Sequence, residues 1–196
     1  FIAPLFHGIG VAMAQATDLA MYFGAGTVYT PQGILEIPGI YRITAPTAAI
    51  ATAPTVREIE SAAGQLELNR ENNNLPIKNT AWRTSPRIFK YLQDLRDAFD
   101  RKAFPEMSAP TPTFRTRPIL ATTNFPSNAG GTTDESSLAL IDFCYVLYGE
   151  SLAMQFATSN EASIVVSPSK TINTWQQGVV GIKVEAEHDV DVQYVE

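Results

Sequence analysis

The chain has 196 residues, of which 45% are hydrophobic and only 17% are charged, and its formal net charge at pH 7 is −6. A chain of this length buries roughly 70% of its unfolded surface on folding, and 10% of the residues are aromatic, which together exclude disorder of the whole chain. No run of about 18 apolar residues occurs, so no membrane-spanning helix is expected. The single cysteine, Cys144, cannot form an intrachain disulfide.

Charge is unevenly distributed along the chain. Residues 1–54 carry only Asp18, Glu36 and Arg42, whereas residues 55–105 have a net charge of +2 and residues 106–196 a net charge of −7. A segment with so few charges is poorly suited to face water. We therefore expect residues 1–54 to lie in a core or to pack on something outside this chain.

Apolar residues spaced by three or four predict a helix over residues 5–23, which glycines at 24 and 26 should end. The next stretch, 31–33, should turn the chain into a short apolar run at 34–35, and residues 43–54 suggest a loop with a short strand. The apolar stripe of the helix predicted over residues 5–23 consists of Phe6, Ile9, Met13, Ala16, Ala20 and Phe23.

Two further helices are predicted from their N-terminal signals. Thr55 and Glu58 form a capping box, so a helix should follow and end at the asparagines 72–74. Ser85 at the N-cap and Pro86 at the first helical position predict a helix over 86–102, preceded by a short strand around Trp82. Its expected buried stripe is Ile88, Leu92, Leu95 and Phe99, with exposed ion pairs Lys90–Asp94 and Arg96–Asp100.

Strands are predicted at residues 116–122, 138–148 and 164–166. The clearest element is the alternation of apolar and polar residues over 180–194, which predicts one long half-buried antiparallel strand. Helices and strands do not alternate regularly, so the predicted class is α+β.

Few residues are candidates for catalysis or for binding a phosphate or a metal. His188 lies beside Asp189 and Asp191, but the strand period places it on the apolar face and the aspartates on the other, so a packed histidine is favoured over a catalytic one. His7 lies in the first helix, and the glycines at 8, 10, 24 and 26 match no phosphate-binding motif. Cys144 is expected to be buried in a strand, and the acidic ladder of residues 185–191 to be a solvated face. We therefore predict no catalytic, cofactor-binding or metal-binding residues.

Several passages, in this order, resemble a known family. Residues 16–27 with 31–35 are similar to the alanine-rich helix and glycine turn of tailed-phage major capsid proteins of the Hong Kong 97 fold. Residues 82–105 resemble that family's tryptophan and Ser-Pro helix, and 117–120, 142–143 and 175–192 resemble its later strands. Ile141 departs from the family, which usually has glycine there.

The resemblance implies an α+β capsid fold, with a mixed-sheet axial domain flanked by helices and a peripheral domain of a long spine helix and long antiparallel strands. Residues 1–45 would belong to the peripheral domain, 46–171 to the axial domain, and 172–196 to a strand returning to the peripheral domain. Because Phe1 is not an initiator methionine, we expect an N-terminally truncated chain that lacks the N-arm and E-loop and is monomeric or loosely associated.

The implied function is structural. Copies of the protein would associate into pentamers and hexamers of an icosahedral shell around double-stranded DNA, which they would contact only weakly and without sequence specificity. Portal, scaffold, protease and decoration proteins are the further partners implied, in the virion and, during assembly, in the host cytoplasm. Two alternatives stay open: an encapsulin-like shell that encloses a cargo enzyme, and a small α+β enzyme that uses His188 with an acidic partner.

Overall fold

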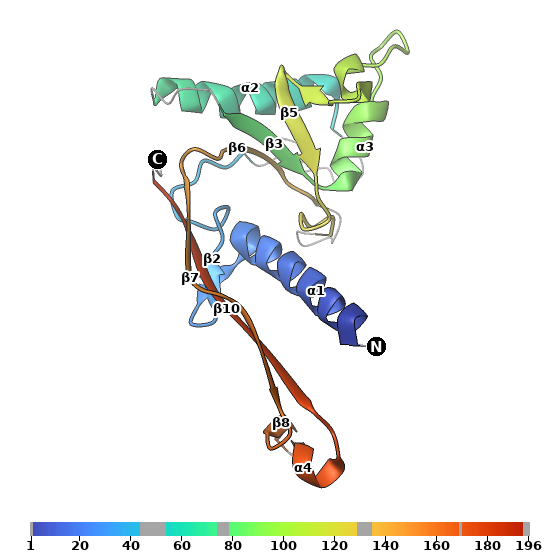
Figure 1. Cartoon of the computed structure of the whole chain (residues 1–196). Coiled ribbons are helices and arrows are strands. Elements are labelled where there is room, and N and C mark those ends of the chain that lie inside the picture. Colours follow the sequence, from blue (N-terminus) through green and yellow to red (C-terminus); the bar gives the residue numbers. More distant parts are fainter. Residues whose placement is uncertain (1, 44–53, 74–78, 129–134, 169, 194–196) are drawn as a thin grey trace. The chain divides into compact units, whose positions relative to one another are not determined.

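The computed structural model describes residues 2–43, 54–73, 79–128, 135–168 and 170–193 (Figure 1). Its contacts divide the chain into two units. The first contains residues Phe1–Leu147 and Asp191–Glu196, and the second contains Tyr148–Val190. Helices and strands occur together, as predicted for an α+β chain.

A four-stranded mixed sheet organises the first unit. Its strands are β3 (Thr80–Thr84), β4 (Thr113–Phe114), β5 (Arg117–Ala121) and β6 (Leu138–Asp142), in the order β4-β5-β3-β6. The central strand β3 is parallel to β5 and antiparallel to β6, so Trp82 lies between Ile119 and Leu140. The strands predicted around Trp82 and over residues 116–122 are confirmed.

Both predicted helix starts are confirmed. The Thr55 hydroxyl accepts a hydrogen bond from the Glu58 backbone N–H at 3.4 Å, and the Glu58 carboxylate accepts one from the Thr55 N–H at 2.7 Å. The Thr55 hydroxyl also donates to this carboxylate at 2.8 Å, and the bonds that the carboxylate accepts from Thr55, above all the one from the backbone, hold the pKa of Glu58 below its usual value. Helix α2 (Val56–Asn72) follows this capping box, and α3 (Pro86–Asp94) follows the Ser85 cap.

Helix α3 ends eight residues before the predicted end at residue 102. The Asp97 carboxylate accepts hydrogen bonds from the backbone N–H groups of Phe99 at 2.8 Å and Arg101 at 2.9 Å. An aspartate side chain that binds nearby N–H groups competes with the helix for them. The predicted burial of Phe99 is therefore wrong, since this side chain is 78% exposed.

The structure also differs from the prediction in the two ion pairs expected on this helix. Lys90 donates to the Gln93 side chain at 2.8 Å. Arg96 and Asp100 do pair, at 3.5 Å, but they lie in the loop that follows the helix.

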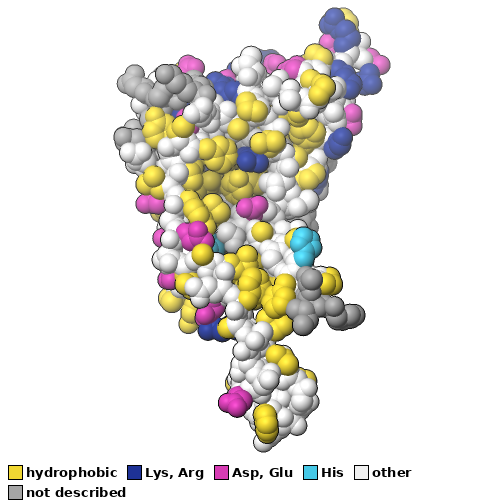
Figure 2. Space-filling model, in the orientation of Figure 1, with side chains coloured by type: hydrophobic (Ala, Val, Ile, Leu, Met, Phe, Trp, Pro, Cys, Tyr) yellow, Lys and Arg dark blue, Asp and Glu magenta, His cyan; other side chains and the backbone are white. Residues whose placement is uncertain are grey.

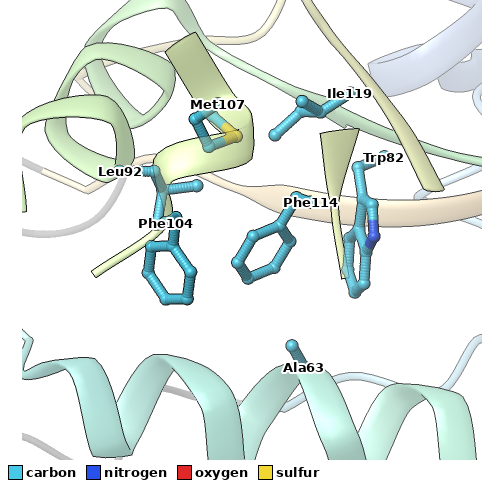
Figure 3. Close-up of a cluster of buried hydrophobic side chains, with 7 residues drawn as sticks. All are labelled: Ala63, Trp82, Leu92, Phe104, Met107, Phe114 and Ile119. Atoms are coloured by element: carbon cyan, nitrogen blue, oxygen red, sulfur yellow. The ribbon is translucent and has the colours of Figure 1, made fainter. Parts of the chain in front are cut away.

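The core of the first unit lies between the sheet and the two helices. Trp82 is fully buried, and its ring meets that of Phe114 edge-on at 5.3 Å, while Phe104 meets Phe114 at 5.1 Å. Figure 3 shows these rings facing Ala63 on α2. Leu92 of α3, Met107 of the 3₁₀ helix η1 (Pro105–Ser108) and Ile119 of β5 complete the cluster.

Helix α1 (Ile2–Phe23) confirms the predicted first helix. It leads into a hairpin of β1 (Ala25–Thr27) and β2 (Thr30–Gln32), which the sequence pattern did not reveal because each strand has only three residues. The C-terminal end of α1 is held by the segment after β5. The Phe125 ring meets those of Tyr22 and Phe23 at 5.0 and 5.1 Å, and Asn124 donates to Asp18 at 3.1 Å.

The chain after β2 satisfies the last carbonyl groups of α1, which have no partner within the helix. The backbone N–H of Ile34 donates to the carbonyl of Met21 at 2.8 Å, and that of Leu35 to Tyr22 at 3.1 Å. This return needs a residue without a side chain at position 33. A Cβ on Gly33 would lie 2.4 Å from the Gly24 nitrogen and 2.5 Å from the Phe23 nitrogen.

Replacing Gly33 by alanine is therefore expected to destabilise the protein by about 1–3 kcal/mol, since backbone atoms must shift to admit the methyl group. Thermal unfolding measures the loss, and hydrogen exchange of the last turn of α1 locates it. Gly8→Ala is the matched control, because nothing lies within 4 Å of its added Cβ and alanine favours a helix interior by up to about 1 kcal/mol. Equal behaviour of the two variants would contradict the close-approach argument.

The single strand predicted over residues 138–148 is wrong, because a turn at residues 143–145 separates β6 from β7. The Asp142 carboxylate accepts a hydrogen bond from the Cys144 N–H at 3.0 Å, and the Asp142 carbonyl accepts one from Tyr145 at 3.2 Å. Cys144 therefore lies exposed in a turn and not, as predicted, buried in a strand. Its sulfur accepts a hydrogen bond from the Asn79 amide at 2.8 Å.

Most of the second unit is an antiparallel β structure. Strand β7 (Val146–Ser159) pairs with β10 (Gly181–Val192), and β8 (Ser163–Ser167) pairs with β9 (Lys170–Asn173). A one-turn helix, α4 (Thr174–Gln177), connects β9 to β10. The predictions of a strand near residues 164–166 and of a long final strand are confirmed.

Candidate assembly surfaces

The two histidines lie on different elements, His7 on α1 and His188 on β10. His188 is half-buried on β10 and its ring stacks on that of Tyr148 at 6.2 Å, while its Nε2 atom has no hydrogen-bond partner among the described residues. Asp189 and Asp191 are exposed, and each accepts the backbone N–H of the residue after it. The prediction that the strand separates His188 from the two aspartates is confirmed. His7 is exposed on α1.

The other predicted features lie on different elements. The glycines at 8 and 10 are inside α1, and Gly24 ends that helix. The acidic ladder of β10 is exposed as predicted, and Lys183 pairs with Glu185 at its start. Within the described ranges, no three His, Cys, Asp or Glu side chains are grouped as a metal site would require, and no helix is long and apolar enough to cross a bilayer.

A basic loop projects from the first unit between α3 and η1. We call residues 95–103 the finger loop. Figure 2 shows Lys and Arg side chains gathered at the top right, where this loop lies in Figure 1. Its ends are paired, because Arg96 and Lys102 form an antiparallel bridge, and its tip presents Phe99 beneath the guanidinium group of Arg101.

Asp97 fixes the shape of the finger loop. Hydrogen bonds from the backbone N–H groups of Arg101 and Phe99, together with the Arg101 side chain, hold the pKa of Asp97 below its usual value. The ionised carboxylate therefore stabilises the loop at neutral pH, and this contribution is lost as the pH falls through the lowered pKa. The loop is thus a preformed projection with a defined tip.

Partly buried ion pairs attach the β4–β5 turn to helix α2. The Glu67 carboxylate accepts from Arg115 at 2.8 and 3.0 Å and also from Arg117. A second pair joins Arg70 of the same helix to Asp142 at the end of β6. These long-range pairs connect helix α2 to the β4–β5 turn, to β5 and to β6.

Among the described residues, large apolar side chains are highly exposed at the β1–β2 turn and at one end of the second unit. In the first unit, the turn between β1 and β2 presents Val28 and Tyr29, which are 91% and 96% exposed. In the second unit, the end that carries β8, β9 and α4, which we call the 160–182 tip, presents Trp175 at 77% and Val165 at 71% exposure. Exposed apolar patches of this kind are typical of protein interaction sites.

The 160–182 tip also contains a hollow of about 300 Å³, lined by Asn160, Thr174, Trp175, Gly178, Val179 and Val180. Its floor is fixed by Thr174, whose N–H and hydroxyl both donate to the Ala162 carbonyl at 3.0 and 2.9 Å. Gly178 ends α4 in the left-handed conformation, with φ of 63°. The tip therefore has exposed apolar side chains beside an open hollow.

Sequence reasoning did not identify the finger loop or the 160–182 tip, whereas Val28 and Tyr29 lie in the charge-poor residues 1–54, which were expected to lie in a core or to pack on something outside the chain. Because the apolar spacing of residues 86–102 predicted one continuous helix, the residues of the finger loop were predicted to be helical. The low charge of residues 160–182, where Glu161 and Lys170 are the charged residues, was the available signal for the tip.

Comparison with known proteins gives a consistent result. The model of the phage capsid family matches residues 7–196. The major capsid protein of Klebsiella oxytoca phage phiKO2 is 28% identical over 192 residues, which cover 98% of this chain and 44% of that protein. The chain thus spans less than half the length of this curated relative.

Solved structures share the fold. The capsid of a native GTA particle matches with a TM-score of 0.63 and 15% identity, covering 98% of this chain and 62% of that one. A structure from Mycobacterium phage Cain matches with a TM-score of 0.61 and 15% identity, covering 98% and 59%. The capsid fold that the sequence predicted is confirmed by these neighbours. Because the family model matches nearly the whole chain, the chain belongs to the phage capsid family.

Proposed function

We propose that this chain forms the wall of a phage or prophage head, in which many copies associate as pentamers and hexamers of an icosahedral shell around double-stranded DNA. The family match over residues 7–196 carries the proposal. The relative from phage phiKO2 is named a major capsid protein, and the GTA structure is named a capsid.

The proposal assigns a structural rather than a catalytic role. The stacked His188, without an acidic partner in the described part of the chain, supports this role against the alternative of a small enzyme. The exposed features with a defined shape are the finger loop, the β1–β2 turn and the 160–182 tip, which suit contacts between subunits. Portal, scaffold, protease and decoration proteins are the further partners proposed, with assembly in the host cytoplasm.

The domain assignment is part of the same proposal. Residues 1–45 and 172–196 belong to the peripheral domain, and residues 46–171 supply the axial domain. The pairing of β7 with β10 supports one change to these bounds, in which residues 146–159 join the peripheral strands instead of the axial domain. The four-stranded sheet with α2 and α3 forms the body of the axial domain.

A wall with little affinity for DNA suits repeated packaging and release. Proteins that hold DNA tightly neutralise its phosphates with clustered Lys and Arg, whereas this chain has a net charge of −6. We expect the inner face of the assembled particle to have a neutral or negative potential. A strongly basic lumen in a map of the assembled particle would contradict this expectation.

Expression of the full reading frame that contains this chain, followed by electron microscopy, tests the proposal. We expect closed particles of megadalton mass, and DNA inside those purified from phage-producing cells. Particles that enclose a cargo enzyme instead would support the encapsulin-like alternative. Failure to assemble under any condition, or a catalytic activity abolished by His188→Gln, would contradict the proposed function.

A further inference from the structure

We propose that Arg70 of α2 is a latch on the two-stranded ribbon of β7 and β10. It holds closed the end of the ribbon that belongs to the first unit, and its release opens that end while the four-stranded sheet stays folded. The inference does not depend on the proposed function, because it concerns local opening within one free chain. It assigns to Arg70 a conformational role beyond its ion pair with Asp142.

Both strands of the ribbon begin or end in the first unit. The boundary between the two units crosses β7 after Leu147 and β10 before Asp191. Next to the first residue of β7 and the last residue of β10, the backbone N–H of Gln193 donates to the Tyr145 carbonyl at 2.9 Å. We call this bond the root of the ribbon, because it closes the pair of strands within the first unit.

Arg70 contacts the segment that leads from β6 into this root at two places. Its guanidinium group donates to the Asp142 carboxylate at the end of β6, and it lies over the ring of Tyr145, 5.9 Å from the ring centre. Hydrogen bonds between charged groups are stronger than neutral ones, and an aromatic ring attracts a cation placed over its face. One side chain of α2 therefore holds the first and the last residue of segment 142–145.

The latch and the turn use different atoms. The side chains of Arg70 and Asp142 are only 12% and 4% exposed, so water competes little with their ion pair. Asp142 also accepts the backbone N–H of Cys144 at 3.0 Å, and this bond shapes the turn from within. Loss of the Arg70 contacts would therefore leave the internal bond of the turn in place and remove its attachment to α2.

The ribbon depends on such an attachment more than the sheet does. Most residues of β7 are exposed, and segments with few buried contacts open locally at a lower cost in free energy than global unfolding. The sheet, by contrast, packs around Trp82, which is fully buried. Removing the latch should therefore open the root well before it affects the sheet.

Hydrogen exchange of the intact chain, followed residue by residue by NMR, tests the inference. The variant combines Arg70→Met with Asp142→Asn, so that no buried carboxylate is left unpaired, and the asparagine oxygen can still accept the Cys144 N–H. The amides of Tyr145 and Gln193 should exchange at least about tenfold faster, whereas those of β3 should change by less than about threefold.

Two further variants separate the contacts. Arg57→Met is the matched control, since Arg57 is exposed on the same helix, and it should leave exchange at the root unchanged. Tyr145→Leu removes the ring but keeps the Arg70–Asp142 pair, so it should raise exchange at Gln193 by only part of the effect. Arg70→Met should then add less in the presence of Tyr145→Leu than alone, because the two side chains are coupled.

Two results would overturn the inference: unchanged exchange at Tyr145 and Gln193 in the double variant, or an equal rise at these amides and at those of β3. The second result would show that Arg70 supports the whole unit rather than the root. If the double variant does not fold, Tyr145→Leu decides, and unchanged exchange at Gln193 in that variant would overturn the inference. The absence of shells from the full reading frame would contradict the proposed function alone, because root opening is measured in the free chain.

Discussion

Replacing Trp82 by alanine is expected to lower the free energy of unfolding by about 3–5 kcal/mol, the usual cost of removing a large aromatic side chain from a core. Trp82 has no exposed surface, lies on the central strand β3 and contacts the ring of Phe114. The cavity would open between the sheet and α2, where the surrounding rings cannot close it without moving the strands.

Denaturant unfolding followed by circular dichroism measures this loss. Trp175→Ala is the matched control, because Trp175 is 77% exposed and surface substitutions usually change stability by less than about 0.5 kcal/mol. Trp82→Phe should cost less than alanine, since it keeps most of the ring and removes an indole N–H that has no partner among the described residues. A loss below about 1 kcal/mol for Trp82→Ala would show that Trp82 is not a core residue.

Replacing Glu67 by glutamine is expected to cost about 1–3 kcal/mol, because removing one member of a partly buried ion pair leaves its partner charges uncompensated, at less cost than in a fully buried pair. The side chains of Glu67 and Arg117 are only 13% and 16% exposed. Burial lowers the pKa of Arg117, which means that its surroundings disfavour the charged form. The Glu67 carboxylate offsets that cost.

The same substitution tests the β4–β5 turn. Arg115 and Thr116 both have positive φ, 49° and 66°, a backbone conformation that residues other than glycine and asparagine rarely adopt. The two hydrogen bonds from Arg115 to Glu67 help to hold it. Loss of Glu67 should therefore raise hydrogen exchange at this turn as well as lower global stability.

Glu71→Gln is the control for Glu67→Gln, since Glu71 is exposed on the same helix and its replacement should change the free energy of unfolding only slightly. A double variant of Glu67→Gln with Arg117→Met should recover at least about 1 kcal/mol of the loss, because the uncompensated charge is then removed too. Additive losses in the double variant would show that the two residues are not coupled.

Local signals in the sequence predicted local structure well. The capping box of Thr55 with Glu58, and Ser85 followed by Pro86, each define a helix start through atoms only a few residues apart. The alternation over residues 180–194 likewise predicted β10, because the period of a strand is visible in its own residues.

The predictions of secondary structure were wrong where a single side chain redirected the backbone. The apolar spacing up to Phe99 is compatible with a helix, and only the hydrogen bonds accepted by Asp97 end it earlier. Asp142 acts in the same way before Cys144. Whether an aspartate remains on a helix or strand or binds the backbone beside it depends on the competing packing, which no periodicity reveals.

The surfaces were the least predictable part. Whether Trp175 is buried depends on residues far from it in the sequence, and two tryptophans in one chain can have opposite exposure, as Trp82 and Trp175 do. The fold class could therefore be predicted from the sequence, whereas the contact surfaces required the arrangement of β8, β9 and α4.

The two-stranded ribbon of β7 and β10 has an entropic consequence. Twelve of the fourteen residues of β7 are exposed, and an isolated two-stranded ribbon is only marginally stable in water. In a free subunit this ribbon is expected to open and close locally, at little cost in free energy. Under the proposed function, each subunit that joins a shell would lose this freedom, so the ordering of the ribbon would make the first contacts entropically unfavourable.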